Sequence, residues 1–259
     1  MLTDTHTHLF SKEFSDETAY AHVQRAIDAG VEKMFMPNVD LSTIAAMNQI
    51  AATFPNNCFS MIGLHPCSVE ADFEEKLAVL AKELAQQKYY GIGETGLDYY
   101  WDTTFTAQQK QSLTQHARWA KQYQIPIILH TRNAFADTLA IMQSENNADL
   151  RGIFHCFSEN AAAAQEVIAL GDFYIGIGGV ITFKKNTELA ETVAATSLEH
   201  IVLETDAPYL APTPYRGKRN ESAYLPLIAQ KIAEIKAVSI AEVIAQTSRN
   251  AQKLFGINK

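Results

Sequence analysis

The sequence TDTHTH, residues Thr3 to His8, decides how the rest of the chain is interpreted. It reads as a short strand that runs into two histidines one residue apart. Because successive side chains on an extended backbone point to opposite faces, His6 and His8 face the same way. Two imidazoles side by side at a strand end form a natural chelate for a transition metal, and the alternative is a pair of surface histidines. The positions of the other histidines decide between these interpretations.

Short apolar runs alternate along the chain with stretches long enough for helices. The strand-like runs are Leu2–His6, Lys33–Pro37, Cys58–Ile62, Tyr90–Gly93, Ile127–Leu129, Gly152–Phe154, Phe173–Ile177 and Ile201–Leu203. Helices are expected near residues 16–29, 42–53, 73–87, 106–123, 134–145, 160–170, 186–196, 221–235 and 239–253. Alternation of this kind, with strands that are almost continuously hydrophobic, predicts a parallel sheet buried on both faces.

The length of the chain favours a closed barrel over an open, doubly wound sheet. A TIM-type (β/α)8 barrel needs about 250 residues, and this chain has 259. No G-x-G-x-x-G motif follows the first strand, which disfavours a dinucleotide-binding fold. No linker or low-complexity segment divides the sequence, so residues 1–259 are expected to form a single α/β barrel domain.

The amino-acid composition indicates where the protein is located in the cell and how it could bind a substrate. Hydrophobic residues make up 47% of the chain and charged residues 19%, with a net charge of −8. A net acidic protein is not expected to coat nucleic acid with an extended basic face, so any such substrate would be bound at a local site. No apolar run approaches the ~20 residues of a membrane span, and no secretory signal is evident. Three scattered cysteines, Cys58, Cys67 and Cys156, favour a reducing compartment, and a cytoplasmic location is expected.

Polar residues gather at the positions where the predicted strands end. In a barrel of this type the active site is built from the carboxyl ends of the strands and the loops that follow. The residues at these positions are His6, His8, His65, Glu94, His130, His155, Glu204 and Asp206. Gathering them at one mouth without a metal would leave like charges in a partly desolvated site. His22, His116 and His200 lie in helical stretches or before a strand and are interpreted as structural.

The donor set is larger than one tetrahedral zinc ion needs. It suits two divalent metal ions that share one carboxylate and one water. Glu94 is the predicted bridge, because the fourth strand lies between the two groups of histidines. The predicted ligands of one ion are His6, His8 and Asp206, and those of the other are His130 and His155.

Several motifs, in order, resemble those of a known family. They are DTHTH (4–8), GLHP (63–66), GETGLD (93–98), HTR (130–132), HCF (155–157), ETDAPYL (204–210) and RGKRNE (216–221). The series is similar to that of the TatD family, which are metal-dependent deoxyribonucleases among the amidohydrolase-like barrels. The resemblance covers essentially the whole chain. It implies a TIM-like barrel, a divalent metal requirement and phosphodiester hydrolysis, with 3′→5′ exonuclease action on single-stranded DNA.

The resemblance implies the same six metal ligands, and the sequence departs from the family pattern at two places. The family often has Gly soon after the segment that begins at His155, where this chain has Glu159-Asn160. It often has Pro after Arg-Asn-Glu, where this chain has Ser222. Both departures affect loops around the mouth, so they concern substrate preference more than metal binding.

The expected nucleophile is a hydroxide derived from a water that bridges the metals. Asp206 is the predicted proton acceptor as this water attacks, and Glu94 shares the catalytic role as the bridge. His65 is expected to contact the phosphate or to protonate the leaving oxygen. The alternative for His65 is a supporting histidine that fixes the loop before Pro66.

Three arginines are predicted to bind the substrate. Arg132 lies two residues after a predicted ligand and could clamp a phosphate oxygen. Arg216 and Arg219 belong to the densest positive stretch of the chain, for which a solvated loop is the alternative. The aromatic residues 99–101 are expected either to stack on unpaired bases or to pack at the rim.

The expected partner is nucleic acid, through single-stranded DNA 3′ ends, without membrane association, and the chain is expected to act as a monomer. Zinc or nickel is expected in the purified protein, and magnesium or manganese in catalysis. One alternative is a metallohydrolase acting on another ester or amide, such as a D-aminoacyl-tRNA deacylase. A further alternative is a metal-binding or nucleic-acid-binding module without turnover.

Overall fold

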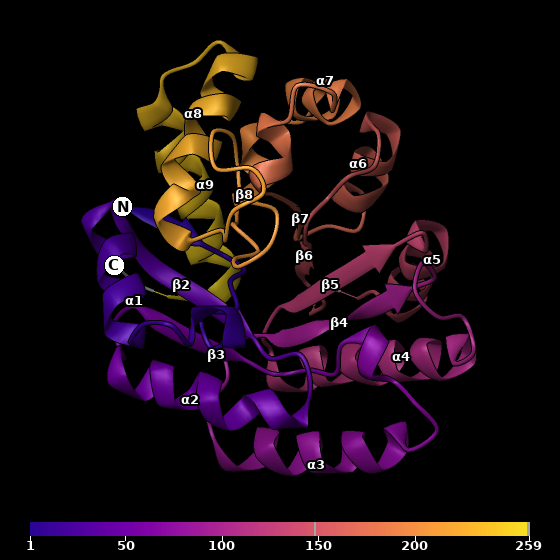
Figure 1. The fold of residues 1–259 in the computed structure, drawn as a ribbon. Coiled ribbons are helices and arrows are strands. Elements are labelled where there is room, and N and C mark those ends of the chain that lie inside the picture. The colour runs from indigo at the N-terminus through magenta and orange to yellow at the C-terminus, as the bar shows by residue number, and fades with distance from the viewer. Residues whose placement is uncertain (148, 258–259) are drawn as a thin grey trace.

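The computed structural model describes residues 1–147 and 149–257, and in it strands and helices alternate around a central ring (Figure 1). The strands are β1 Leu2–Asp4, β2 Val31–Pro37, β3 Cys58–Met61, β4 Ile92–Asp98, β5 Ile127–Arg132, β6 Gly152–Phe154, β7 Phe173–Ile177 and β8 Ile201–Leu203. The helices are α1 Ala19–Asp28, α2 Ile44–Thr53, α3 Phe73–Gln86, α4 Thr106–Tyr123, α5 Phe135–Glu145, α6 Ala161–Ile168, α7 Thr187–Ala195, α8 Leu225–Lys236 and α9 Ile240–Phe255.

The strands form two parallel sheets whose edges meet. One sheet has the order β1-β2-β3 and the other the order β4-β5-β6-β7-β8. A parallel bridge between Ile62 and Ile92 joins the edges at β3 and β4. A second bridge, between Thr7 and Ala207, joins the segments that follow β1 and β8. Eight parallel strands therefore form a closed ring, and the predicted TIM-type (β/α)8 barrel is confirmed.

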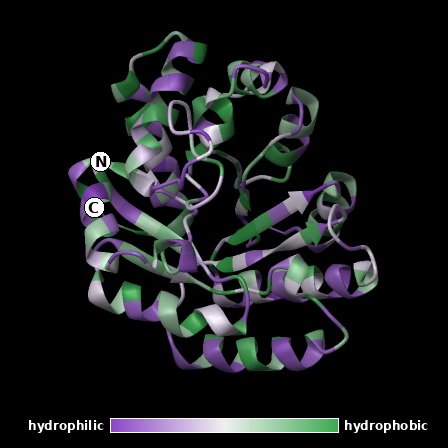
Figure 2. Cartoon of the chain, in the orientation of Figure 1, coloured by the Kyte–Doolittle hydropathy of each residue, from purple (hydrophilic) through white to green (hydrophobic). Residues whose placement is uncertain are grey.

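Alternate residues of the strands face two separate cores. The larger core lies between the strands and the surrounding helices, whose outer faces are hydrophilic, as the mixed purple and green of α3 shows (Figure 2). The smaller core takes residues from β2, β3, β5, β6, β7 and β8 and fills the ring. Its floor is formed by the end of α9, where the Phe255 ring stacks on Phe35 at a centroid distance of 3.6 Å. The floor leaves the carboxyl ends of the strands as the open end.

Two strands continue further along the chain than the sequence predicts, and β2 begins two residues earlier, at Val31. β4 continues to Asp98 and β5 to Arg132, so Glu94 and His130 lie within strands and not just after them. Glu94 and the residues after it remain paired in the β-sheet because β4 and β5 approach each other closely. At Gly96, which pairs with His130, a Cβ atom would lie 1.9 Å from the His130 carbonyl oxygen.

Other predicted boundaries differ by a few residues at most. The largest difference is at α8, which begins at Leu225 because residues 222–224 form a short 3-10 turn before it. Over the described residues, no helix is both long and apolar enough to cross a membrane.

Candidate metal centre

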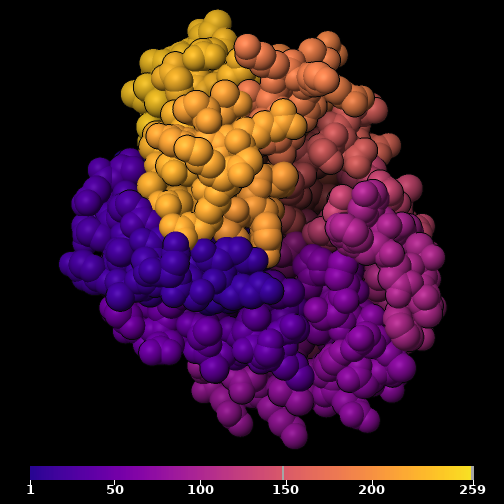
Figure 3. Space-filling view, in the orientation of Figure 1, coloured from indigo at the N-terminus to yellow at the C-terminus, as the bar shows by residue number. Residues whose placement is uncertain are grey.

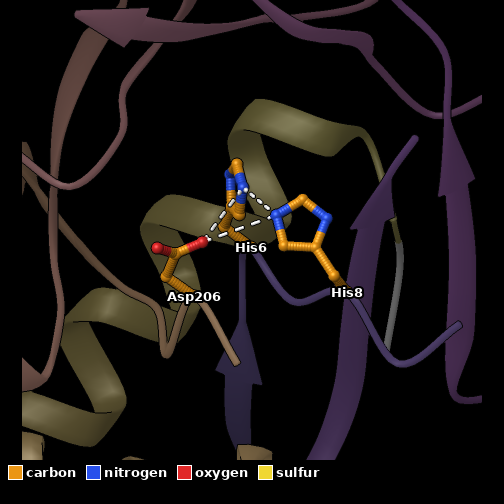
Figure 4. Close-up of side chains that lie close together, drawn as sticks. All are labelled: His6, His8 and Asp206. Carbon is orange, nitrogen blue, oxygen red and sulfur yellow. Dashed lines mark hydrogen bonds and ion pairs between the residues drawn. The ribbon is translucent and has the colours of Figure 1, made fainter. Parts of the chain in front are cut away.

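One polar cluster, here called the inner group, consists of His6, His8 and Asp206. Figure 4 shows the three side chains pointing toward one another. The Nε2 atoms of His6 and His8 lie 3.2 Å apart, and Asp206 Oδ1 lies 3.7 Å and 3.4 Å from them. Both imidazoles are buried. The two rings converge, as their spacing in the sequence predicts.

The inner group is held where the ring closes. The backbone N–H of Asp206 donates to the carbonyl of His6 at 2.9 Å. A second contact joins the same two segments. The buried Asp4 carboxylate accepts from the backbone N–H of Thr205 at 2.9 Å and from the Thr205 hydroxyl at 2.6 Å. Burial raises the pKa of Asp4 to about 7, although these hydrogen bonds act in the opposite direction. Asp4 therefore braces β1 against the segment after β8.

A second cluster, the outer group, consists of His65 and His130 on the other side of Glu94. Glu94 Oε1 lies 3.5 Å from His65 Nε2 and 3.0 Å from His130 Nδ1. The side chains of His65 and His130 are 15% and 17% exposed, compared with 0% for His6. The imidazoles of the outer group are therefore more exposed than those of the inner group, whose third member, Asp206, is 14% exposed.

Glu94 lies between the two groups and turns one oxygen toward each. Its Oε2 atom lies 3.2 Å from His6 Nε2 and 3.5 Å from His8 Nε2. Its Oε1 atom lies 2.9 Å from His155 Nε2, in addition to its contacts with the outer group. A bridging carboxylate requires this geometry, in which the two oxygens face separate sets of ligands.

The spacing and chemistry of the donor atoms fit a metal ion. Ligands of a tetrahedral ion with bonds of about 2.1 Å are separated by roughly 3.4 Å. The donor atoms of the inner group and Glu94 Oε2 lie 3.2 to 3.7 Å from one another in the measured pairs. Among the described residues, neither Glu94 nor Asp206 forms an ion pair with Lys or Arg. Imidazole and carboxylate donors together suit a divalent transition metal.

In a neutral imidazole one ring nitrogen carries the proton and the other carries a lone pair. The hydrogen-bond partner of the nitrogen that points away from the centre determines which nitrogen is protonated. His8 Nδ1 donates to the Pro37 carbonyl at 3.1 Å, and His130 Nε2 donates to Asp98 Oδ2 at 2.9 Å. The protons are therefore on the outward nitrogens. The lone pairs of His8 Nε2 and His130 Nδ1 are directed toward Glu94, as metal ligands require.

The outward nitrogen of His155 faces a buried carboxylate. Its Nδ1 lies 3.5 Å from Glu204 Oε1, and its ring stacks on His6 at a centroid distance of 3.8 Å. Glu204 also accepts the backbone N–H of Cys156. A Cβ atom at position 176 would lie 2.2 Å from Glu204 Oε2, so Gly176 provides the space that this carboxylate occupies.

His65 differs from the other imidazoles in the position of its proton. The backbone N–H of Cys67 donates to His65 Nδ1 at 3.1 Å. Neutral His65 therefore carries its proton on Nε2, which faces Glu94. His65 lies within ligand distance of Glu94 and His130, and this tautomer makes its Nε2 a hydrogen-bond donor toward the centre.

The carboxylates of the centre are ionised by their neighbours. Burial would raise the pKa of Glu94, but the charges of His155, His65 and His6 hold it well below its usual range. Burial would also raise the pKa of Asp206, but the hydrogen bond with His8 and the charge of His155 lower it. The centre therefore presents two buried carboxylates that attract a cation.

A cavity of about 660 Å³ opens onto the centre. His8, His65, Glu94, His130, His155 and Asp206 line it. Figure 3 shows the molecule hollowed between the orange segment after β8 and the magenta segments of β4 and β5. His6 is not among the lining residues, in keeping with its position behind the other imidazoles.

The structure brings one of the three predicted substrate-binding arginines into this cavity. Arg132 lines it, with the guanidinium 3.8 Å from the centroid of the Tyr100 ring. Arg216 lies over the Phe183 ring at 4.4 Å and is not among the lining residues.

The prediction for Arg219 is corrected. Its guanidinium forms ion pairs with Asp16 at 2.6 Å, Glu17 at 2.6 Å and Glu221 at 3.2 Å, and it is not among the residues that line the cavity. Three carboxylates engage its two terminal nitrogens. Arg219 therefore fastens the loop after β8 to the segment before α1, and it does not face the centre.

Sequence reasoning gave Asp98 no role, yet it connects several parts of the site. Besides its bond with His130, its Oδ1 atom accepts the backbone N–H groups of Tyr100 and Trp101 at 2.9 Å and 3.3 Å. Burial would raise the pKa of Asp98, but the hydrogen bond from His130 lowers it to about 2. The available signal was its position four residues after Glu94 on one strand, which places both side chains on the same face.

The structural interpretation of His116 is confirmed. Its Nδ1 donates to the Ser112 carbonyl at 2.7 Å, and its Nε2 accepts the backbone N–H of Leu64 at 3.1 Å. Burial lowers the pKa of His116 to about 4, so the ring is neutral. His116 supports the outer group indirectly, because Leu64 precedes His65.

The sequence matches a known family over nearly its whole length. The profile described as TatD related DNase matches residues 3–256. The Bacillus subtilis protein named uncharacterized metal-dependent hydrolase YabD is 35% identical over 258 residues, which cover 100% of both chains. The Escherichia coli K12 protein named uncharacterized metal-dependent hydrolase YcfH is 33% identical over 266 residues, covering 99% of this chain and 96% of its own.

A solved structure gives the same result. The crystal structure of YjjV, a TatD homolog from Escherichia coli K12, matches with a TM-score of 0.92 and 27% identity. The match covers 99% of this chain and 98% of that one. This chain therefore belongs to the family of TatD-related DNases, and it resembles over its full length proteins named metal-dependent hydrolases.

Proposed function

We propose that this protein is a divalent-metal-dependent deoxyribonuclease that removes nucleotides from the 3′ end of single-stranded DNA. One observation carries the proposal: the two oxygens of Glu94 face two separate groups of imidazoles at the bottom of a cavity. Membership of the TatD family supports the same activity. Two divalent ions, held by His6, His8 and Asp206 on one side and by His130 and His155 on the other, fit this arrangement.

Metal ions bound there supply Lewis acidity, which polarises a phosphate and lowers the pKa of water. Asp206 accepts the proton of the attacking water. Its carboxylate is ionised and lines the cavity. Arg132 holds a phosphate oxygen of the strand, because it is the cavity-lining residue with a guanidinium.

His65 assists the leaving group. The neutral ring keeps its Nε2 proton toward the centre because Nδ1 accepts from Cys67, so the ring can donate a hydrogen bond to the 3′ oxygen that leaves and stabilise the charge that develops there. The hydrogen bond from Cys67 holds the ring in this tautomer. The supporting role of His65, fixing the loop before Pro66, comes from the same bond and does not compete with this assistance.

This role is tested with two substrates that differ in the leaving group. His65→Ala is expected to lower the rate on a 3′-labelled DNA strand about 100-fold, the usual cost of losing one hydrogen bond to a developing oxyanion. The rate on bis(p-nitrophenyl) phosphate should fall much less, because p-nitrophenolate leaves without a proton. An equal fall on both substrates would leave His65 with a structural or ligand role only.

The proposed activity is tested by elemental analysis followed by assays with added Mg²⁺ or Mn²⁺. The substrates are 3′-labelled single-stranded DNA, duplex DNA and a D-aminoacyl-tRNA, each given to wild type, to Asp206→Ala and to the control Asp172→Ala. Asp172 is a surface residue paired with Lys253. We expect bound zinc or nickel, cleavage of the single strand by wild type and the control, and none by Asp206→Ala.

Other results have definite meanings. Release of the D-amino acid without DNA cleavage would replace the deoxyribonuclease by a deacylase that uses the same centre. Bound metal without turnover of any substrate would favour a binding module. DNA cleavage at equal rates by all three proteins would show that the site is elsewhere.

A further inference from the structure

Large hydrophobic side chains on the described surface gather at the mouth of the cavity. The exposed ones are Met1, Tyr20, Val79, Tyr100, Trp101, Tyr209 and Leu210. Four of these seven follow β4 or β8, and Trp101, Tyr209 and Leu210 line the cavity. Trp101 is 69% exposed, more than any other of the set. Apolar side chains that gather on an otherwise polar surface mark a binding site.

Trp101 belongs to an ordered arrangement of rings and charge. Tyr100 and Trp101 meet edge to face, with ring centroids 4.9 Å apart and an interplanar angle of 88°. The Arg132 guanidinium lies 3.8 Å from the Tyr100 centroid and 5.2 Å from that of Trp101. We call these three side chains the aromatic platform.

Asp98 fixes the distance between the platform and the metal centre. One oxygen of its carboxylate accepts the backbone N–H groups of Tyr100 and Trp101, and the other accepts from His130 Nε2. Gln109 holds Asp98 in turn, through hydrogen bonds to both its backbone N–H and its carbonyl group. The platform and the outer group are therefore anchored to the same side chain.

The charge of the cavity shows what the platform must contribute. Among the described residues that line the cavity, Arg132 is the single Arg or Lys, and the protein carries a net charge of −8. Neutralisation of phosphates can therefore supply little of the affinity for a nucleic acid strand. Stacking of bases on aromatic rings supplies ~1–3 kcal/mol per base without requiring positive charge.

We propose that the aromatic platform stacks against an unpaired nucleobase next to the scissile phosphate, and that it selects single strands over duplexes. This inference rests on the proposed function and adds the feature of the substrate that the site recognises. A base within a duplex is already stacked on both faces, so Trp101 can engage it only after unstacking. The unpaired base is common to single-stranded DNA and to single-stranded RNA ends, including that of tRNA.

Binding is tested by fluorescence, without any need for turnover. The chain has two tryptophans, and Trp119→Phe leaves Trp101 as the only one. Titration of this variant with a phosphorothioate-linked dT tetramer should quench most of its emission in a saturable manner. An abasic tetramer of the same charge and a blunt duplex should quench much less. A U tetramer separates RNA from DNA as the source of the base.

Catalysis provides the second test. The quantity compared is kcat/KM on single-stranded DNA divided by kcat/KM on bis(p-nitrophenyl) phosphate, a substrate that has no base. Trp101→Ala should lower this ratio about 10-fold. The matched control is Tyr20→Ala, which removes a 63% exposed ring that packs on Phe54 and does not line the cavity. Its ratio should equal that of wild type.

The outcomes separate this inference from the proposed function. Absence of DNA cleavage by wild type, with strong quenching by the dT tetramer, would refute the deoxyribonuclease and retain the platform. DNA cleavage with an unchanged ratio in Trp101→Ala would refute the platform and retain the deoxyribonuclease. Equal quenching by the abasic and dT tetramers would show that charge, and not the base, is recognised, which also refutes the platform.

Discussion

The inner and outer groups use the same kinds of side chain but are built differently. The inner group is fixed by the main chain, since backbone hydrogen bonds join Thr5 to Leu203 at 3.0 Å and Asp206 to His6 at 2.9 Å. Its imidazoles are buried, and the barrel itself sets their positions. A ligand set held in this way is preorganised by the fold.

The outer group is held by one side chain and one loop amide instead. Asp98 orients His130, and the backbone N–H of Cys67 orients His65. Both imidazoles are partly exposed to the cavity. For the two ions of the proposed function, the contrast predicts that the inner ion is retained more firmly during purification and that the outer ion exchanges more readily with solvent.

The largest effect is expected at the residue that both groups share. Glu94→Ala removes both oxygens, so kcat/KM should fall at least ~1,000-fold, about 4 kcal/mol. Bound metal should fall for both groups, because each loses a ligand. Kinetics on bis(p-nitrophenyl) phosphate and elemental analysis check this, with the surface variant Glu166→Ala as the control. Retention of one full equivalent of metal by Glu94→Ala would show that the groups do not share the carboxylate.

The next effect concerns the support of the outer group. The pKa of His116 is about 4 in the folded protein and 6.5 as a free side chain, so the unfolded chain binds more protons between these values. Its contribution to stability is therefore present above pH ~6.5 and is lost as the pH falls toward ~4, by up to ~3 kcal/mol. His116→Gln, whose amide can both donate and accept, should not show this loss.

Urea unfolding of both metal-free proteins between pH 4 and pH 7 provides the measurement. The free energy of unfolding of wild type, minus that of His116→Gln, should decrease as the pH falls. Parallel curves for the two proteins would mean that His116 is protonated in the folded state.

A smaller effect should separate the two groups directly. Asp98→Asn places an amide N–H against His130 Nε2, which moves the ring proton to Nδ1 and turns it toward Glu94. Affinity for the outer ion should weaken ~10–100-fold, as is usual when such a supporting residue is lost. Titration with Mn²⁺ should show one weakened site and one unchanged site. Equal weakening of both sites would contradict the independence of the inner group.

The smallest effect is expected at the arginine that lies outside the centre. Arg219→Ala breaks partly exposed ion pairs, and the free energy of unfolding should fall by about 1 kcal/mol. The value of kcat/KM on single-stranded DNA should stay within twofold of wild type, whereas Arg132→Ala should raise KM about 10-fold. Comparable losses of activity in both variants would restore Arg219 as a substrate-binding residue.

Much of the barrel is predictable from the sequence because its signal is local. Each strand from Cys58 to Leu203 lies within or beside an apolar run, and the mouth is recognised by the polar residue that follows. The local signal fails at β4, where the polar sequence after Gly93 remains a strand. Pairing with β5 keeps it extended, and that pairing involves residues more than thirty positions away.

The roles of Asp98 and Arg219 depend on contacts that no local pattern contains. Arg219 looks like a free cation in a basic stretch, yet its partner Asp16 is 203 positions away. Asp98 is recognisable in sequence only by its shared face with Glu94, and its bond with His130 depends on the register of β4 and β5. Side chains that orient other side chains are the part of a site that sequence specifies least directly.

Closure of the ring between β1 and β8 determines when the centre can form. The hydroxyl of Thr5 bonds the carbonyl of Leu203 across 198 positions, so this contact joins opposite ends of the chain. Contacts of such separation form late in folding, since the entropy of closing the loop must be lost first. During synthesis His6 and His8 are made well before Asp206, so the inner group is complete only after Asp206 has been added. A chain that ends before β8 lacks Asp206, so its inner group is incomplete, and metal binding to the inner group therefore reports closure of the ring.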